Sequence, residues 1–465
     1  MDIEWMTAVQ LREAYQARSL SPMEVARALL ARIERVDRRI HAFLALDPEA
    51  VLAQARRAEA ALYDDEPLGP LHGVPISLKD TIDAAGLRCT SGSIWRADRI
   101  PAEDAISVAR LRAAGAIILG KTNTSEFATC GRTVNRLGLE TVNPWDTSRT
   151  SAGSSGGSGA AVAAGMGPIA IGTDAGGSIR YPAAFNGVFG LMASSDLVPK
   201  LGNFEINAFG SPFSSIGPLA RSVRDAALAL QAMAGHDPRD AMSSRRPVPD
   251  YLAACDEGVK GLRVGWVTPP ASAHREPGVE EAVRAACDGF ESLGASVGAL
   301  SETLPVPSDI SGPIMGAAFQ EIRRLAAEPG RRRMLSPYVV EWLAAPTPTP
   351  EQEAAAWALR RAAQARMRDI FGRVDLIASP VTCFPAPRSP QDPFANFLPY
   401  DRYTTLPAVA NVLGLAASAI PCGMHEGLPI ALMLMAPRGQ EACILRASAA
   451  FERAWPWADR RPPVD

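Results

Sequence analysis

The chain is organised around a glycine- and serine-rich stretch, TSAGSSGGSG at residues 150–159. A second stretch of this kind, GTDAGGS at residues 172–178, follows closely. Glycine lets backbone N–H groups approach a neighbouring group because it carries no Cβ, and serine supplies hydroxyls that can attack or relay a proton. The apolar run at residues 160–171 between the two stretches argues against a flexible linker. We therefore expect a site built from backbone donors and hydroxyls.

The composition is that of an ordinary globular protein, with 465 residues of which 47% are hydrophobic and 21% charged. The net charge of −3 gives no electrostatic reason to expect nucleic acid as a partner. The uncharged runs at residues 153–173 and 406–424 are rich in Gly, Ala, Ser and Pro, which favours buried elements over membrane spans. The five histidines are scattered, so we expect no metal site.

The cysteines and the first residues bear on the compartment. The seven cysteines form no C-x-x-C pair, which is typical of free thiols in a reducing compartment. Residues 1–4 are acidic and lack the basic and apolar regions of a secretory signal. We therefore expect a cytoplasmic protein.

Helices alternate with short apolar strands up to about residue 230, a pattern that predicts an α/β layer architecture. One expected strand spans residues 73–80 and ends in Lys79 and Asp80. We expect four regions: an N-terminal helical region (1–66) that packs on the core, the core itself (67–232), a helical and strand insertion (233–372), and the C-terminal part of the same α/β domain (373–465). The composition turns polar and proline-rich around residues 235–251, near the start of the insertion.

Two motif matches carry little weight on physical grounds. Residues 115–122 fit the phosphate-loop pattern, but residues 116–119 form an apolar run that belongs inside a strand, not in a loop around phosphate. Cys130 has no histidine near it in sequence, so we expect an inert core thiol.

Residues 153–157 fit the G-x-S-x-G nucleophile elbow, with Ser155 as the attacking residue. That motif requires a strand directly before it, whereas residues 143–149 read as a loop. His425 could in principle serve as the base. An esterase with Ser155 as nucleophile therefore stays as an alternative hypothesis.

A different set of residues, Lys79, Ser154 and Ser178, could also carry chemistry. A neutral lysine can act as a general base when burial lowers its pKa. The apolar residues before Lys79 favour such burial. An ordinary ion pair with Asp80 or Asp83 explains the lysine equally well, and the residues alone leave both interpretations open.

An ordered series of motifs resembles the amidase signature family of serine hydrolases. It comprises GVP at 73–75, KD at 79–80, GKTN at 120–123, EF at 126–127, NPW at 143–145, GSSGGS at 153–158, GTDAGGSIR at 172–180, PAAF at 182–185, GPLARS at 217–222 and GLP at 427–429. The resemblance is strong from about residue 68 to 230 and weaker beyond. It implies a large α/β/α sandwich around a central mixed, mostly parallel twisted sheet.

The resemblance also implies roles for individual residues. Ser178 would be the nucleophile that forms an acyl-enzyme, Ser154 the proton relay after a cis peptide bond, and Lys79 the general base. The oxyanion hole would consist of the backbone N–H groups of Ala175, Gly176, Gly177 and Ser178. No cofactor is required, and the implied supporting residues are Gly153, Ser155, Thr173, Asp174 and Arg180.

The chain departs from the family pattern at two places. Ser151 and Ala152 stand where Pro-Gly is common, and GLMASSD at residues 190–196 replaces the common Gly-Leu-Lys-Pro-Thr-x-Gly. The second change puts membership of the tRNA-linked amidotransferase branch in doubt. An amidotransferase component that uses glutamine-derived ammonia with a partner chain therefore stays as an alternative, and so does a binding protein without catalysis, against which the intact Lys79, Ser154 and Ser178 argue.

By the same resemblance, the pocket wall comprises Ala128, Thr129 and Cys130, and aromatic residues such as Phe209 and Phe213 are expected to cap it. An apolar wall favours an apolar acyl or aryl group. We therefore expect hydrolysis of a small aryl- or short-acyl amide, anilide, urea or carbamate. That the aromatic residues fill the core instead is nearly as good an interpretation. The sequence is compatible with a homodimer and gives no reason to expect a membrane partner.

Overall fold

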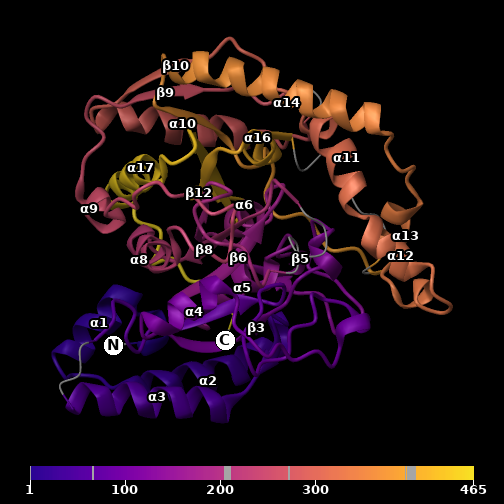
Figure 1. Ribbon diagram of the computed structural model, residues 1–465. Coiled ribbons are helices and arrows are strands. Elements are labelled where there is room, and N and C mark those ends of the chain that lie inside the picture. The colour runs from indigo at the N-terminus through magenta and orange to yellow at the C-terminus, as the bar shows by residue number, and fades with distance from the viewer. Residues whose placement is uncertain are drawn as a thin grey trace.

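A single mixed sheet forms the centre of the protein, seen in Figure 1 in a computed structural model. The structure describes residues 2–64, 68–203, 211–270, 273–392, 394 and 405–464. The sheet has 11 strands in the order β1 (Phe43–Leu46), β3 (Ile117–Thr122), β2 (Pro75–Lys79), β6 (Ile169–Asp174), β8 (Ser215–Ala220), β7 (Phe189–Met192), β12 (Ala416–His425), β13 (Leu428–Ala436), β11 (Leu376–Pro380), β9 (Arg263–Trp266) and β10 (Ser296–Ala299).

The strand directions correct one expectation. The sheet is mixed, as predicted, but it is not mostly parallel. Of its ten neighbouring strand pairs, only β2–β3, β2–β6, β9–β11 and β9–β10 are parallel, and the other six are antiparallel. The antiparallel pairs fill the middle of the sheet from β6 to β11, where β12 and β13 form a hairpin.

Helices cover both faces of this sheet. The helices are α1 (Ala8–Gln16), α2 (Pro22–Ile40), α3 (Pro48–Tyr63), α4 (Ile106–Ala113), α5 (Gly156–Ala163), α6 (Arg180–Asn186), α8 (Val223–Met233), α9 (Tyr251–Asp256), α10 (Val279–Ser292), α11 (Pro307–Ala318), α12 (Gln320–Ala326), α13 (Pro337–Ala344), α14 (Pro350–Phe371), α16 (Thr405–Leu413) and α17 (Glu441–Ala454). Short 3-10 helices are η1 (Ile3–Trp5), η2 (Ile94–Arg96), η3 (Glu126–Ala128) and η4 (Arg332–Met334).

In the central strands, alternate residues point to opposite faces of the sheet and into separate cores, as the pleat of a strand requires. In β13, Leu432 and Leu434 pack into the core beneath α4, α8, α9, α10 and α17. Met433 and Met435 of the same strand pack into the core beneath α5, α6, α11, α14 and α16. The two cores on opposite faces make the fold the α/β/α sandwich that the resemblance implied.

Strands from all four expected regions share the one sheet. β1 comes from the N-terminal region and lies at one edge, whereas β9 and β10 come from the insertion and lie at the other. The division into four regions therefore stays a prediction. The chain ends also meet, since Arg461 pairs with Asp2 at 2.6 Å.

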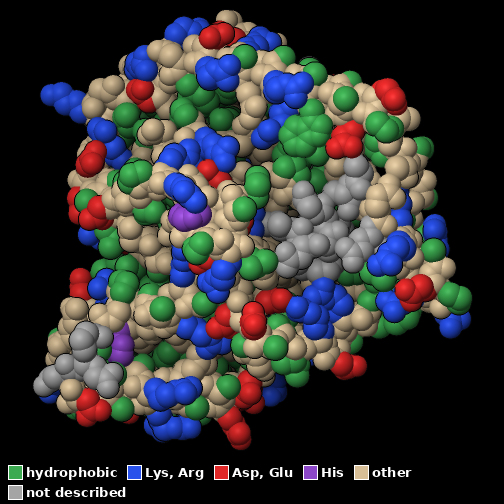
Figure 2. Space-filling model, viewed as in Figure 1, with side chains coloured by type: hydrophobic (Ala, Val, Ile, Leu, Met, Phe, Trp, Pro, Cys, Tyr) green, Lys and Arg blue, Asp and Glu red, His purple; other side chains and the backbone are tan. Residues whose placement is uncertain are grey.

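Two further sequence expectations can be compared with the structure. The apolar part of the phosphate-loop match lies in β3, as predicted. Residues 143–149, however, are not a plain loop, because Val142–Asn143 (β4) and Asp146–Thr150 (β5) pair as a small antiparallel sheet. The helices and the surface were also compared with what a membrane or nucleic-acid partner would require. None of the described helices is long and apolar enough to cross a lipid bilayer. On the face shown in Figure 2, acidic and basic side chains are interspersed and not gathered by sign.

Candidate active site

Lys79 ends strand β2, the third strand from one edge of the sheet, and its side chain is fully buried. Its amine donates hydrogen bonds to Oγ of Ser154 at 2.7 Å and to Oγ1 of Thr173 at 2.5 Å. Thr173 lies on β6, the parallel neighbour of β2, so pairing of the two strands brings these groups together. The fold thus joins Lys79 to two hydroxyl residues that lie 75 and 94 positions further along the chain.

The carboxylates next to Lys79 in sequence have other partners. Asp83 pairs with Arg99 at 2.5 Å. Asp80 accepts a hydrogen bond from the backbone N–H of Thr90 at 3.0 Å, and burial raises the pKa of its carboxyl. Of the two interpretations of Lys79, the contacts favour a lysine directed at hydroxyls.

The first glycine-rich loop carries Ser154 at the entrance to helix α5. The Gly153–Ser154 peptide bond is cis, as the resemblance implied, and both Ser154 and Ser155 are fully buried. The loop is so tightly packed that a Cβ on Gly156 would lie 2.2 Å from Oγ1 of Thr133. Only glycine fits at this position, which explains part of the unusual composition of the stretch.

Ser155 ties the two glycine-rich loops together. Its hydroxyl donates to the backbone carbonyl of Thr173 at 3.2 Å and accepts from the Thr173 N–H at 3.3 Å. Its backbone N–H donates to the carbonyl oxygen of Ser178 at 3.2 Å. A strand, β5, does end shortly before it, but the Ser155 hydroxyl is buried in these contacts, which favours a supporting role over that of a nucleophile.

The second loop begins where β6 ends, at Asp174, and holds Ser178 in place through backbone contacts. The Asp174 carboxylate accepts hydrogen bonds from the N–H groups of Gly177 at 2.6 Å and Ile179 at 3.0 Å, on either side of Ser178. Gly177 has a φ of +118°, a backbone conformation that residues other than glycine rarely adopt. Ser178 retains 7% of its surface exposed.

A fully buried ion pair anchors this loop. The Arg180 guanidinium lies 3.0 Å from the Asp174 carboxylate, and both side chains are 0% exposed. Asn411 on α16 donates to the same carboxylate at 2.9 Å and accepts from Arg180 at 2.6 Å. Burial alone would raise the pKa of Asp174, but the charge and hydrogen bonds of Arg180, with the hydrogen bond of Asn411, lower it to about 2.

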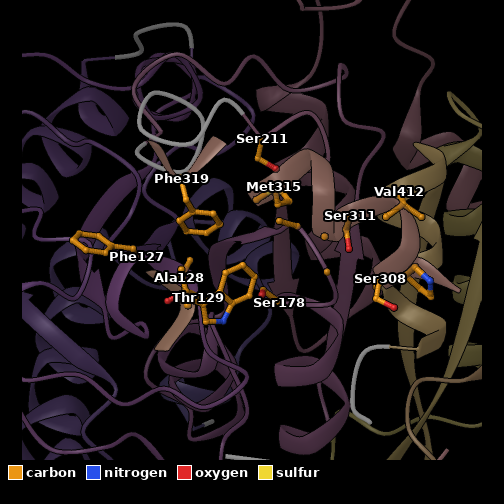
Figure 3. Close-up of a pocket in the computed structure, with 16 residues that line it drawn as sticks. Phe127, Ala128, Thr129, Ser178, Ser211, Ser308, Ser311, Met315, Phe319 and Val412 are labelled. Atoms are coloured by element: carbon orange, nitrogen blue, oxygen red, sulfur yellow. The ribbon is translucent and has the colours of Figure 1, made fainter. Parts of the chain in front are cut away.

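A cavity of about 330 Å³ opens beside Ser178. Figure 3 shows Ser178 in its wall, with Ala128 and Thr129 to one side and Ser308 and Ser311 to the other. The described lining consists of uncharged residues: Phe127, Ala128, Thr129, Ala175, Gly176, Ser178, Ser211, Pro307, Ser308, Ser311, Gly312, Met315, Phe319, Trp342, Ala408 and Val412.

Only some of the expected pocket residues line the cavity. Ala128 and Thr129 line the cavity, as do Ala175 and Gly176 of the expected oxyanion loop. Cys130 and Phe213 are absent from its described lining; Cys130 is buried behind it, where desolvation raises the pKa of its thiol to about 12, and Phe213 belongs to the core. Phe209 lies outside the described residues.

Sequence reasoning missed the far wall of the cavity, which comes from residues 307–342. Helix α11 contributes Ser308, Ser311, Gly312 and Met315, Phe319 follows in the turn before α12, and Trp342 lies on α13. Residues 308, 311, 312 and 315 recur at helical spacing as one face of small or flexible side chains. That periodicity was the available signal, but nothing in it indicates which part of the fold the face covers.

Comparisons with known proteins agree on one family. The family model described as Amidase matches residues 24–445. A glutamyl-tRNA(Gln) amidotransferase subunit from Chloroflexus aggregans is 38% identical over 500 residues, covering all of this chain and 99% of the relative. Among solved structures, a bacterial aryl acylamidase of the amidase signature family is similar with a TM-score of 0.88, 28% identity and coverage of 98% and 97%. Peptide amidase from Stenotrophomonas maltophilia is similar with a TM-score of 0.83, 30% identity and coverage of 98% of each chain.

Proposed function

Because the chain belongs to the amidase signature family, we propose that it hydrolyses the C–N bond of a small, uncharged amide through an acyl-enzyme on Ser178. The observation that carries this choice of substrate is the cavity beside Ser178, whose described lining has no charged side chain. A charged substrate group buried there would lose its hydration without gaining a partner, which is costly. An aryl or short-acyl amide, anilide or carbamate meets no such cost.

In the proposed mechanism Lys79, in its neutral form, takes a proton from Ser154 while Ser154 takes the proton of Ser178. The distance of 2.7 Å between the Lys79 amine and the Ser154 hydroxyl supports the first of these transfers. Ser178 Oγ then attacks the amide carbonyl. The relay returns a proton to the leaving nitrogen, the C–N bond breaks, and water cleaves the acyl-enzyme by the same route.

The oxyanion of the tetrahedral intermediate would accept hydrogen bonds from backbone N–H groups between Ala175 and Ser178. Two observations support this role. Ala175 and Gly176 line the cavity next to Ser178, and the Asp174 carboxylate fixes the loop from beneath. Thr173 and Ser155 would hold the groups of the proton relay in position, and Asp174 and Arg180 would act as structural anchors.

A second candidate function is the glutaminase step of an amidotransferase, because a component of that enzyme is similar over the full length of the chain. Glutamine carries an α-ammonium and an α-carboxylate, and both need charged or strongly polar partners when buried. The uncharged described lining weighs against such a substrate, and so does GLMASSD at residues 190–196. Glutamine therefore belongs in any substrate panel as the competing prediction.

The test compares hydrolysis of neutral aryl and acyl amides with hydrolysis of L-glutamine, measured as released amine or ammonia. Ser178→Ala and Lys79→Met should each lower kcat/KM by about a thousandfold or more. Ser418→Ala is the matched control, because Ser418 is a buried serine whose hydroxyl has no hydrogen-bond partner in the described chain. Wild-type turnover by Ser178→Ala would refute the assignment, and a clear preference for glutamine would favour the second function.

The pH profile tests the lysine separately. Because the base must be unprotonated to accept a proton, kcat/KM should fall as the pH is lowered. A profile that stays flat down to about pH 5 would contradict a neutral lysine as base.

A further inference from the structure

Helix α11 presents one continuous face to the cavity. Ser308, Ser311, Gly312 and Met315 lie at spacings of three and four residues, so they form a single stripe on the helix. Figure 3 shows Ser308, Ser311 and Met315 along this wall, and Phe319 beyond them. Helix α11 and the turn that follows it therefore form a large part of the wall opposite the glycine-rich loops.

Gly312 leaves open space in the middle of this stripe. A Cβ built on Gly312 meets no atom of the described residues within 4 Å, whereas one on Gly316, a turn further along, would lie 2.7 Å from Pro348. Close packing thus explains the glycine at 316 but not the one at 312. Glycine inside a helix costs about 1 kcal/mol relative to alanine, and at position 312 the missing side chain enlarges the cavity.

The end of the cavity beyond Met315 is aromatic. Phe319 and Trp342 pack with ring centroids 5.0 Å apart and an interplanar angle of 44°. Trp342 remains 37% exposed although it is a large apolar residue, and both rings line the cavity. Aromatic rings gain from tilted or offset contact with a further ring. An aryl group entering past Gly312 and Met315 would find such partners.

We propose that Gly312 and Met315 set the size of the apolar group that the cavity accepts, and that this group is an aryl ring packed against Phe319 and Trp342. The inference rests on the proposed function and deepens it, because it names neutral aryl amides as the substrate class. It also assigns selection among amides to α11, away from the glycine-rich loops.

The test is a ladder of primary amides, propionamide, benzamide and 2-naphthamide, scored as the ratio of kcat/KM for naphthamide to that for propionamide. Gly312→Leu fills the cavity and should lower this ratio by about tenfold or more. Met315→Ala enlarges the cavity and should raise the ratio. Asp309→Leu places a leucine on the same helix outside the described cavity lining and should leave the ratio unchanged.

Two controls keep the result interpretable. Gly312 precedes Pro313, and proline restricts the residue before it partly through that residue's Cβ. Gly312→Ala shares this restriction with Gly312→Leu but reaches less far, so the ratio should fall in the order Gly, Ala, Leu. The aryl preference is tested with benzamide against cyclohexanecarboxamide, and Trp342→Ala should reduce that preference by about two- to tenfold.

The outcomes separate the two proposals. If the wild type hydrolyses none of these amides, and none of the anilides and carbamates that the proposed function also allows, that function is wrong. If it hydrolyses them but Gly312→Leu and Met315→Ala leave the naphthamide ratio within twofold, the assignment of α11 is overturned while the function stands. An unfolded Gly312→Leu leaves the decision with Met315→Ala, whose ratio must rise. An unchanged aryl preference in Trp342→Ala refutes the aromatic partner.

Discussion

Replacing Asp174 by asparagine removes one negative charge from the centre of the second glycine-rich loop while keeping the size of the side chain. One carboxylate oxygen accepts hydrogen bonds from Gly177, Arg180 and Asn411, and the other from Ile179 and Arg180. An asparagine has one acceptor oxygen, and its NH₂ group would face donors that now point at an oxygen. Several donors, including those of a buried guanidinium, would lose their partner.

The size of the expected loss in unfolding free energy follows from the burial of Arg180. Because Arg180 is 0% exposed, its charge would remain in the interior without a counterion, a change that costs about 3–5 kcal/mol of unfolding free energy. The pKa of Asp174 gives a second measure of how strongly its surroundings stabilise the charged carboxylate. Its lowering from 3.8 to about 2 in the folded state corresponds to about 2 kcal/mol of preference for the charged form.

Urea unfolding at pH 7, followed by circular dichroism, measures this loss directly. The matched control is Glu34→Gln, which removes a carboxylate from the pair with Arg38, whose side chains are 75% and 74% exposed. Such an exposed helical pair should contribute no more than about 0.5 kcal/mol. If Asp174→Asn costs less than about 1 kcal/mol, the view that this pair anchors the loop is wrong.

The effect of Asp174→Asn on the unfolding free energy should also depend on pH, and the sign of this dependence can be derived. A carboxyl whose folded pKa is lowered stabilises the protein above its unfolded pKa and loses that contribution as the pH falls through the folded pKa. For Asp174 this window runs from 3.8 down to about 2. The difference in unfolding free energy between wild type and Asp174→Asn should therefore narrow over that range. A difference independent of pH would refute the electrostatic part of the argument.

Two more substitutions probe buried polar groups elsewhere. Tyr338→Phe removes a hydroxyl that donates to the Val134 carbonyl and accepts from the Glu126 N–H, each at 2.7 Å. It should lower the unfolding free energy by about 1–3 kcal/mol in urea titrations, and a neutral effect would contradict these hydrogen bonds. Glu452→Gln should be more stable than wild type by about 3 kcal/mol at pH 8 and equal to it near pH 4, because burial raises the pKa of Glu452 from 4.5 to about 7 and charging it costs stability as the pH rises. Thermal melting of both proteins from pH 4 to pH 8 measures the stability gained by Glu452→Gln. A larger gain at acid pH than at pH 8 would contradict the argument.

Local chemistry determines part of the inner half of the site. An apolar run that ends in Lys79 predicts a buried strand, and β2 has this form. The residues alone left an ion pair with Asp80 or Asp83 equally open, and the catalytic roles of Lys79, Ser154 and Ser178 stay predictions. The two glycine-rich loops were expected to form one site, and the N–H of Ser155 donates to the carbonyl of Ser178.

The direction of the strands was less predictable. Apolar runs identify strands but do not say which way each runs beside its neighbour, because burial depends on the side chains and not on chain direction. The expectation of a mostly parallel sheet was wrong for β6 through β11, where the neighbours are antiparallel. Directions there depend on connections that span many residues and carry no local signal.

The far wall of the cavity was missed for a related reason. It comes from residues 307–342, well beyond the signature segment, and reaches the loops only through the tertiary fold. Tyr338 and Ser336 dock this segment on Glu126, with the Ser336 N–H donating to the Glu126 carboxylate at 2.6 Å. Glutamate and tyrosine are common residues, so no sequence pattern distinguishes a docking contact of this kind from ordinary surface positions.

This arrangement separates the proposed proton path from the choice of substrate. The contacts of Lys79 and Asp174 described above run between β2, β6, the two loops and α16, and none of them involves α11 or α13. A substitution on the cavity face of α11 can therefore change the shape of the cavity without removing any of these contacts. Relatives that share the fold yet are named for an amidotransferase or for an aryl acylamidase are what such a separation allows. Differences in substrate should accordingly follow the residues of α11 to α13, and losses of all activity should follow those of β2 and the loops.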